Sequence, residues 1–254
     1  MSTTITRTAF DCWNAPPPLP VLGRKQVHVW RAALEQPSSV IDALWETLAV
    51  DERERAERFH FRRDREHYIV ARGVLRNVIG RYLGLRPGAL RFRYGSHGKP
   101  ELAVEINEAR INFNVSHSHN LALFAITRER ELGIDIEYVR AEFAQGRVAE
   151  QFFSRREVAA LRALPADAQA VAFFNCWTRK EAYVKAKGEG LSMPLDRFDV
   201  SLVPGEAAAL LDTRGDTREA SRWALQELMP APGFVAAIAV EGHEWELECW
   251  QWQK

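Results

Sequence analysis

Cysteine, long hydrophobic runs and a secretion signal are all scarce or missing in this sequence. Cys12, Cys176 and Cys249 are far apart, odd in number and without a C-x-x-C pair, which argues against a disulfide framework or a zinc site. The longest apolar run, FVAAIAV at 234–240, is too short to cross a bilayer. The first residues, MSTTITRTAFDCW, lack the apolar segment of a signal peptide. We therefore expect a cytoplasmic protein without a membrane segment.

An excess of charge of either sign is also missing. Lys and Arg number 34, Asp and Glu number 34, and the net charge is +0. A neutral chain has no overall field that attracts nucleic acid or an anionic membrane, so we expect neither as a partner. Any anion site must be built locally. The 254 residues, 46% of them hydrophobic, suffice for one large core or two fused smaller ones.

The hydrophobic periodicity predicts an α+β chain made of two similar halves. Long helices are expected at about 64–83, ending at Gly84, and at about 167–187. Each is followed by strand-like runs, which cover 90–94, 111–115 and 121–126 in the first half and 197–202, 222–228 and 233–240 in the second. This pseudo-twofold repeat of a helix and three strands divides the chain into residues 1–130 and 131–254.

Shorter elements carry start signals of their own. Residues 25–30 alternate like a strand. Ser39 and Asp51 are expected to begin two short helices, each with an acidic residue three positions on, as in a capping box. Ser154 and Glu157 form the same motif before a helix in the second half.

The two ends of the chain have unusual composition. APPPLP at 15–20 predicts a polyproline-type surface arm, with partner binding through PxxP as the alternative. WELECWQWQK at 245–254 places aromatic residues on both faces of a strand. We expect an edge strand that covers the second half, with a partner-docking role as the alternative.

The stretch GIDIE at 133–137 is the first candidate for chemistry. Side chains alternate in a strand, so Ile134 and Ile136 point to one face while Asp135 and Glu137 share the other. Neighbouring carboxylates repel unless they are solvated or share a cation, and oxygen ligands favour Mg2+ or Mn2+ over zinc. For a D-x-E pattern taken alone, a solvated outer face is the alternative.

The segment WTRKEAYVKAKGEGL adds a third carboxylate. On a helix, Trp177, Glu181 and Lys185 recur every four residues and share one face, with Lys180 beside them. An ordinary surface helix with a Glu181–Lys185 pair is the alternative. If the helix packs on the GIDIE strand, the three acids can hold Mg2+ and the lysines can neutralise phosphate charge.

The stretch NFNVSHSHN at 112–120 ends a strand in a polar turn. Ser116 and His117 suit a phosphate or ribose contact. Zinc ligation by His117 and His119 lacks any supporting Cys or His cluster, and a Ser-His nucleophile lacks the G-x-S-x-G elbow. The sequence has no Gly-rich phosphate loop that would compete with this site.

Taken in order, GSHGKPEL, NFNVSHS, GIDIE and WTRKEAYVKAKGEGLSMPL closely resemble the 4'-phosphopantetheinyl transferase superfamily, in its larger single-chain surfactin-synthetase-activator type. The resemblance covers about Asp51 to Leu202. It implies two fused α+β halves with coenzyme A and Mg2+ in the cleft between them. The implied reaction moves the phosphopantetheine arm of coenzyme A to a serine of an apo acyl, aryl or peptidyl carrier protein, releasing adenosine 3',5'-bisphosphate. It also implies a monomer, because the fused halves already form the cleft.

The resemblance assigns roles at the metal end of the site. Asp135, Glu137 and Glu181 match the metal ligands. Glu181 is also expected to accept the serine proton, and Lys185 matches the lysine at the pyrophosphate. Lys180 is its neighbour in the W-x-x-K-E pattern and is expected to contact the cofactor. Asp135, Glu181 and Lys185 are therefore the expected catalytic residues.

Nucleotide contacts are implied at four further positions. Lys99, Ser116 and His117 match residues that hold the nucleotide and its 3'-phosphate, and Arg55 stands in a basic position that contacts the same phosphate. Relatives often carry Arg where this chain has His67.

Two substitutions leave open which residues complete this nucleotide site. Either His67 or Arg65 is expected to serve in place of the relatives' arginine. Glu52 stands where relatives can have a second lysine, which is expected to weaken binding of the 3'-phosphate unless Arg53 compensates.

Two rival functions belong to other classes. A non-catalytic coenzyme A or carrier-protein binding module is disfavoured by the intact carboxylates. A two-metal nuclease is disfavoured by the neutral charge and the lack of a basic, aromatic-interleaved groove. Fatty-acid, polyketide and nonribosomal-peptide carriers stay open as partners, and the resemblance to the larger family type favours a promiscuous enzyme of secondary metabolism.

Overall fold

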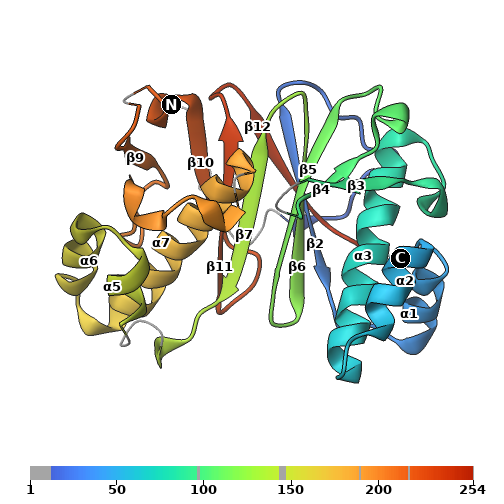
Figure 1. The fold of residues 1–254 in the computed structure, drawn as a ribbon, viewed down its shortest axis with the longest axis horizontal. Helices are drawn as coiled ribbons and strands as arrows, with labels where there is room; N and C mark the ends of the chain where they lie inside the picture. Colours follow the sequence, from blue (N-terminus) through green and yellow to red (C-terminus); the bar gives the residue numbers. More distant parts are fainter. Residues whose placement is uncertain (1–12, 96–97, 143–146, 189, 217, 254) are drawn as a thin grey trace, which may run out of the picture.

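The structure, a computed structural model, describes residues 13–95, 98–142, 147–188, 190–216 and 218–253. Two sheets lie next to each other in the middle of the molecule, and helices cover the outer side of each (Figure 1). In the described part of the chain, no helix is both long enough and apolar enough to span a membrane.

The first half contains the elements up to residue 128. Its strands and helices are β1 (Trp13–Asn14), β2 (Gln26–Ala33), α1 (Ser38–Trp45), α2 (Val50–Glu57), α3 (Arg62–Leu83), β3 (Phe92–Tyr94), β4 (Pro100–Leu102), β5 (Ile111–Ser118) and β6 (Leu121–Arg128). Short 3-10 helices, η1 (Pro87–Ala89) and η2 (Val104–Ile106), precede β3 and β5.

The second half begins with the GIDIE strand. Its elements are β7 (Leu132–Tyr138), α5 (Val148–Phe152), α6 (Arg155–Arg162), α7 (Ala166–Lys187), β8 (Phe198–Val200), β9 (Leu210–Thr213), β10 (Trp223–Leu228), β11 (Phe234–Glu241) and β12 (Glu246–Gln251). The 3-10 helices are η3 (Gly190–Ser192), η4 (Leu195–Arg197) and η5 (Ala220–Arg222).

Both halves repeat one order of elements within the described residues. A strand is followed by α-helices, a two-stranded ribbon and an antiparallel strand pair. The strand order β2-β6-β5 in the first sheet matches β7-β11-β10 in the second, and all these pairs are antiparallel. The α+β class and the repeat predicted from the sequence are confirmed. Each repeat, however, opens with a strand that the helix-plus-three-strands pattern did not include.

The helix signals were confirmed in part. Both long helices end at a glycine in the left-handed region, Gly84 (φ 65°) and Gly188 (φ 71°), where a side chain would be strained. Ser154 and Glu157 form the reciprocal capping box. Short helices are present where Ser39 and Asp51 predicted them, but the predicted caps are wrong, since α1 and α2 begin one residue earlier. At the start of α2, Glu52 accepts from the amide of the N-cap residue Ala49 (2.9 Å).

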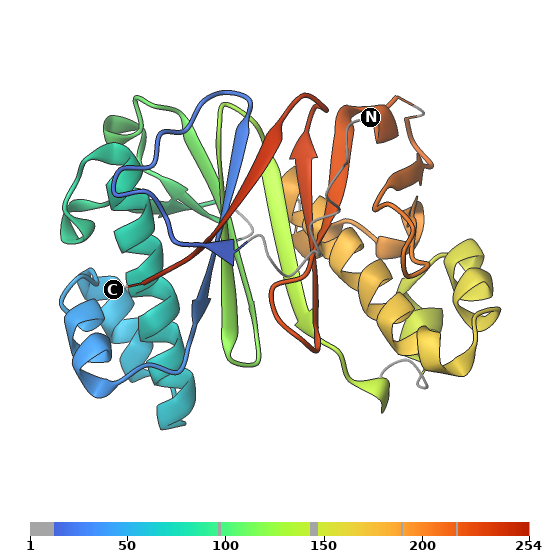
Figure 2. The ribbon, with the colours of Figure 1, turned by 180° about the vertical axis from the view of Figure 1, so that it is seen from behind.

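The last strand does not cover the second half. β12 lies between β1 and β2 in the first sheet and runs parallel to both (Figure 2). Trp250 and Trp252 pack into the core of the first half. The prediction for residues 245–254 is therefore wrong in position, because the chain crosses back to the half in which it began.

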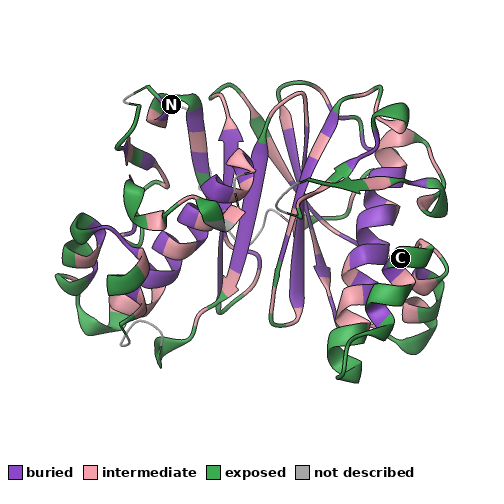
Figure 3. Cartoon of the chain, viewed as in Figure 1, coloured by how far each residue is buried: buried purple, intermediate pink, exposed green. Residues whose placement is uncertain are grey.

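Hydrophobic side chains form cores on both faces of each sheet. One core lies between the first sheet and α3, a second lies between the second sheet and α7, and a third joins the two sheets. Ile134 and Ile136 of β7 belong to the core between the sheets. Figure 3 shows this arrangement as buried strands flanked by helices whose inner faces are buried. The other face of β7 is thereby directed at α7.

The backbone of α7 lies directly on β7 at Gly133. A Cβ atom added at Gly133 would lie 2.1 Å from the Ala182 carbonyl oxygen and 2.3 Å from the Ala186 nitrogen. No side chain fits between the two backbones, so the glycine of GIDIE is required by close approach. This contact fixes the height at which α7 crosses the strand.

We expect Gly133→Ala to lower the free energy of unfolding by about 3 kcal/mol or more, because a methyl group would force the helix away from the strand. Urea unfolding followed by tryptophan fluorescence measures this. Gly215→Ala is the matched control, since no atom lies within 4 Å of its added Cβ, and its effect should stay within about 0.5 kcal/mol. Equal stability of the two variants would contradict the packing described here.

Candidate active site

The two sheets meet along β5 and β7 through a polar ladder, which we define as Asn112, Asn114, Ser116 and Ser118. Asn112 donates to the Arg130 carbonyl (2.9 Å), and Asn114 Oδ1 accepts from the Ile134 amide (2.9 Å). Ser116 donates to Asp135 Oδ1, and Ser118 donates to Glu137 Oε2, each at a distance of 2.8 Å. Alternation along the strand turns these side chains toward β7. The sequence analysis missed Asn114 and Ser118, although N-x-N-x-S-x-S was readable.

Asp135 is the most enclosed carboxylate of the site. Its residue is 4% exposed. Oδ1 accepts from Ser116 and from Lys185 Nζ (2.6 Å). Oδ2 is buried and has no hydrogen-bond partner among the described residues. A buried oxygen without a partner costs free energy, so this atom is suited to an incoming ligand.

The helix α7 brings the second group of residues to the same place. Trp177, Glu181 and Lys185 line a pocket of about 380 Å³, as their spacing of four residues predicts. The rest of its lining is Val115, Ser116, His117, Asp135 and Glu137. Besides Asp135, Lys185 Nζ contacts Ser116 Oγ (3.0 Å) and the Ile134 carbonyl oxygen (3.3 Å). The pocket therefore contains the three predicted acids and one lysine.

The carboxylates of this pocket disfavour one another's charge. Burial raises the pKa of Glu181, and the negative charges of Asp135 and Glu137 raise it further. Burial and Asp135 likewise raise the pKa of Glu137, while the hydrogen bond from Ser118 opposes this. A cation among these groups would relieve the repulsion.

The donor set is chemically suited to a hard cation. The three carboxylates and the Ser116 hydroxyl offer oxygen atoms, the type of ligand that Mg2+ and Mn2+ prefer, and His117 adds a nitrogen donor to the pocket lining. The described residues contain no group of three His, Cys, Asp or Glu side chains already gathered as a metal cage. The Lys185 ammonium takes up one oxygen of Asp135. The unpaired Oδ2 of Asp135 and the raised pKa values fit a divalent ion.

Lys180 does not reach this pocket. Its side chain is 0% exposed and pairs with Glu157 of α6 at 2.8 Å. Its ammonium also donates to the Leu195 and Phe198 carbonyl oxygens, at 2.7 and 2.6 Å. This geometry does not support the predicted cofactor contact, because successive residues on a helix point about 100° apart, which turns Lys180 away from the face of Glu181.

Two of the predicted nucleotide residues lie in the pocket and one lies beside it. Ser116 and His117 line the pocket itself. Lys99 lines a neighbouring hollow together with Lys185 and Asn114. Its ammonium donates to the Lys185 carbonyl oxygen (3.1 Å), and burial lowers the pKa of Lys99. Lys99 therefore binds a backbone carbonyl near the end of α7 and also lines the hollow.

Arg55 belongs to a different hollow on the first half. This hollow measures about 580 Å³, and its lining is Asp51, Glu54, Arg55, Arg58, Phe59, Tyr68 and Tyr94. The Arg55 guanidinium lies over the Tyr68 ring, 5.5 Å from its centroid. Arginine next to exposed aromatic rings can bind an anionic group and a planar base together.

His67 and Arg65 differ in their surroundings. Burial lowers the pKa of His67, with a further contribution from Arg63 and a smaller one from His117. The Nε2 atom of His67 is buried and has no partner within the described residues. Arg65 instead stacks over Trp45 at 5.5 Å. Of the two alternatives, His67 is the one whose pKa is influenced by a pocket residue, His117.

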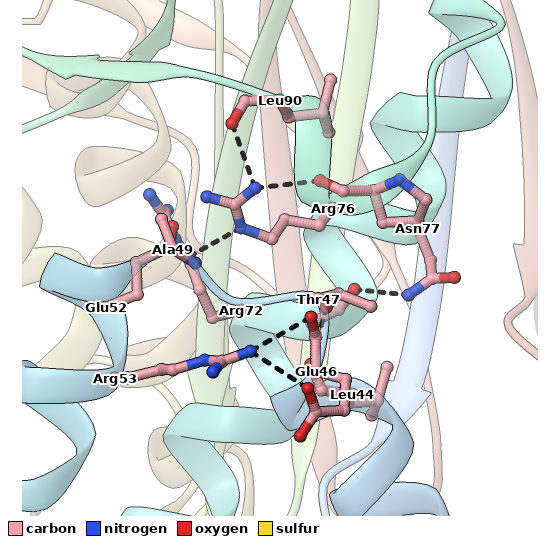
Figure 4. Close-up of polar contacts among 12 residues, drawn as sticks. Leu44, Glu46, Thr47, Ala49, Glu52, Arg53, Arg72, Arg76, Asn77 and Leu90 are labelled. Atoms are coloured by element: carbon pink, nitrogen blue, oxygen red, sulfur yellow. Dashed lines mark hydrogen bonds and ion pairs between the residues drawn. The ribbon is translucent and has the colours of Figure 1, made fainter.

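Glu52 and Arg53 are structural in this chain. Glu52 is 2% exposed and pairs with Arg72 and with Arg76, the latter at 2.6 Å. Arg53 reaches Glu46, as Figure 4 shows, and lies over Trp45. Compensation by Arg53 has no support in this geometry, because both side chains have partners within the first half.

Comparison with known proteins gives an independent result. A family model described as the 4'-phosphopantetheinyl transferase superfamily matches residues 131–239, and one described as 4'-phosphopantetheinyl transferase, N-terminal, matches residues 30–129. The first contains all three pocket carboxylates and Lys185. The second contains Ser116, His117 and Arg55.

Individual relatives agree with the family models. The chain is 41% identical over 240 residues to 4'-phosphopantetheinyl transferase HetI of Nostoc sp., covering 94% of this chain and 98% of the relative. It is 33% identical over 155 residues to 4'-phosphopantetheinyl transferase Sfp of Bacillus subtilis (strain 168), covering 61% and 66%. A human L-aminoadipate-semialdehyde dehydrogenase-phosphopantetheinyl transferase is 29% identical over 209 residues, covering 76% and 67%. This chain therefore belongs to the 4'-phosphopantetheinyl transferase superfamily.

Proposed function

We propose that the pocket between β5, β7 and α7 is where this chain carries out its reaction, the transfer of the 4'-phosphopantetheine group of coenzyme A to a serine of an apo carrier protein. The observation that carries this proposal is the meeting of Asp135, Glu137, Glu181 and Lys185 in one pocket. Two acids come from a strand and one comes from a helix that follows it. A solvated outer face would not bury them in this way.

Asp135, Glu137 and Glu181 are the proposed holders of Mg2+, with Mn2+ as a substitute. The unpaired Asp135 oxygen and the mutual repulsion of the acids support this. The chemistry that such an ion supplies when bound is charge compensation at phosphate oxygens. Lys185 adds a positive charge from the helix side, where its ammonium already contacts Ser116 and Asp135.

Glu181 is the proposed acceptor of the serine proton. It lies in the pocket with Asp135, Glu137 and Lys185, and a carboxylate within reach of the serine hydroxyl can act as its general base. In the transfer, the serine oxygen bonds to the phosphorus that carries pantetheine. The bond from that phosphorus to adenosine 3',5'-bisphosphate breaks, and the serine proton passes to Glu181.

The nucleotide end of coenzyme A is assigned to residues of the carboxylate pocket, of the neighbouring hollow at Lys99 and of the hollow at Arg55. Ser116 and His117 lie next to Lys185, Lys99 lies behind them, and Arg55 offers a cation beside Tyr68. This assignment follows the order of the family motifs along the chain. Binding by separate elements would fix the phosphates relative to the carboxylates, and positioning is the main requirement of phosphoryl transfer.

Several finer points stay predictions from the sequence. These are the cytoplasmic location, the monomeric state, and the choice among acyl, aryl and peptidyl carriers. The non-catalytic binding module is not favoured, because the acids are complete and the matched relatives are named as transferases.

Mass spectrometry of an apo carrier protein tests the function. Incubation with this chain, coenzyme A and Mg2+ should add one phosphopantetheine group to the carrier. A panel of acyl, aryl and peptidyl carriers identifies the preferred class in the same experiment. A carrier panel that stays entirely unmodified would contradict the proposal.

We expect Asp135→Asn to reduce transfer by about 100-fold or more, because it removes a charged ligand and leaves the charge of Lys185 uncompensated. Circular dichroism should show an intact fold. Asp42→Asn, on the exposed side of α1, is the matched control and should keep full activity. A folded Asp135→Asn enzyme with normal turnover would remove Asp135 from the site.

A further inference from the structure

Lys180 is fully buried, yet its charge is completely satisfied within the protein. Its ammonium has three protons and three oxygen partners: Glu157 Oε2 and the carbonyl oxygens of Leu195 and Phe198. It also lies over the Phe198 ring, 4.3 Å from the centroid. An ammonium with these contacts has no proton left for a phosphate, so its function must lie in what it holds.

Glu157 is the centre of the same arrangement. One of its oxygens accepts from the Val200 amide at 2.8 Å, and the other accepts from the Ser154 amide and from Lys180. The pair therefore ties α7 to the start of α6 and to the segment 195–200. Burying an ion pair of this kind is costly unless every group is bonded, as it is here.

The segment held by Lys180 forms one wall of a groove beside Glu181. The groove measures about 250 Å³. Its lining is Gln151, Phe152, Glu181, Val184, Gly190, Met193, Pro194, Leu195 and Asp196, most of it apolar. Glu181 is shared with the phosphate pocket. Lys180 and Glu181 are thus adjacent in sequence, and Lys180 holds a wall of the groove that Glu181 lines.

We propose that Lys180 is a positioning residue for the carrier-protein substrate, and that the groove it shapes receives the chain segment that carries the acceptor serine. This inference rests on the proposed function. The serine hydroxyl must contact Glu181 to give up its proton. The Ser116, His117 and Lys185 side of Glu181 is assigned to phosphates, so residues next to the serine must lie on the other side, over Met193 and Leu195.

The structure therefore divides the two substrates between the two sides of Glu181. Loosening the Leu195–Phe198 segment should weaken the use of the carrier and leave coenzyme A binding unchanged. A lysine that contacted phosphate directly would show the opposite behaviour.

The test uses the double variant Lys180→Met, Glu157→Gln. Replacing both partners avoids leaving an unpaired charge in the core, which a single substitution would do. The KM for the apo carrier should rise about tenfold, because a wall of the groove loses two anchoring bonds. The dissociation constants for coenzyme A and for adenosine 3',5'-bisphosphate, measured by calorimetry, should stay within about twofold of the wild type.

A matched control comes from the next buried cation on α7. Arg179 pairs with Glu227 of β10 at 2.7 Å and also contacts Ser201, so Arg179→Met, Glu227→Gln removes an ion pair that does not hold residues 195–198. This variant should lose stability without a change in either KM. Hydrogen exchange of residues 193–198 should accelerate in the Lys180 variant and stay normal in the control.

Each alternative gives a distinct result. Weaker binding of both coenzyme A and the bisphosphate would show a phosphate role for Lys180 and overturn the inference. Weaker binding of coenzyme A alone would assign the groove to the pantetheine arm and also overturn it. An unchanged KM for the carrier, together with faster hydrogen exchange at residues 193–198, would also overturn the inference. A wild-type protein that modifies no carrier would instead refute the proposed function.

Discussion

The close contact between α7 and β7 at Gly133 is the constraint on which the rest of the site depends. With no side chain between the two backbones, Glu181 and Lys185 are held against Asp135. The polar ladder of β5 acts from the other side, because Ser116 and Ser118 orient the two acids of β7. The pocket is therefore assembled by one helix and two strands from both halves of the chain, and it depends on their packing as much as on its own charges.

Charge in this neutral chain is arranged locally. Buried ion pairs such as Glu52 with Arg72 and Lys180 with Glu157 have their partners supplied by the fold and are saturated with hydrogen bonds. The acids of the pocket differ, since burial and repulsion raise the pKa of Glu137 and Glu181. Groups at a cleft whose pKa is shifted by burial and neighbouring charges are typical of functional sites. The fully paired buried ions therefore belong to the scaffold, whereas the carboxylates with raised pKa belong to the proposed active site.

Local patterns in the sequence predicted the parts of the fold that depend on local physics. The glycine-terminated helices and the alternation of GIDIE were readable because they follow from backbone conformation and strand geometry. The position of β12 was not, because its parallel pairing with β2 joins residues about 220 positions apart in the chain. Lys180 was assigned by its motif, whereas its partners Glu157 and Leu195 are set by tertiary packing. The structural role of Glu52 could not be read from the sequence for the same reason, since its partners Arg72 and Arg76 lie on another helix.

The central claim is that acids from β7 and α7 jointly hold one divalent ion that helps to bind the diphosphate of coenzyme A. Calorimetric titration of coenzyme A in Mg2+ and in chelator measures this directly. We expect binding to be about tenfold tighter or more with Mg2+, and we expect this difference to disappear when Glu137 is replaced by Gln. Equal affinity with and without the ion in the wild-type protein would contradict the account.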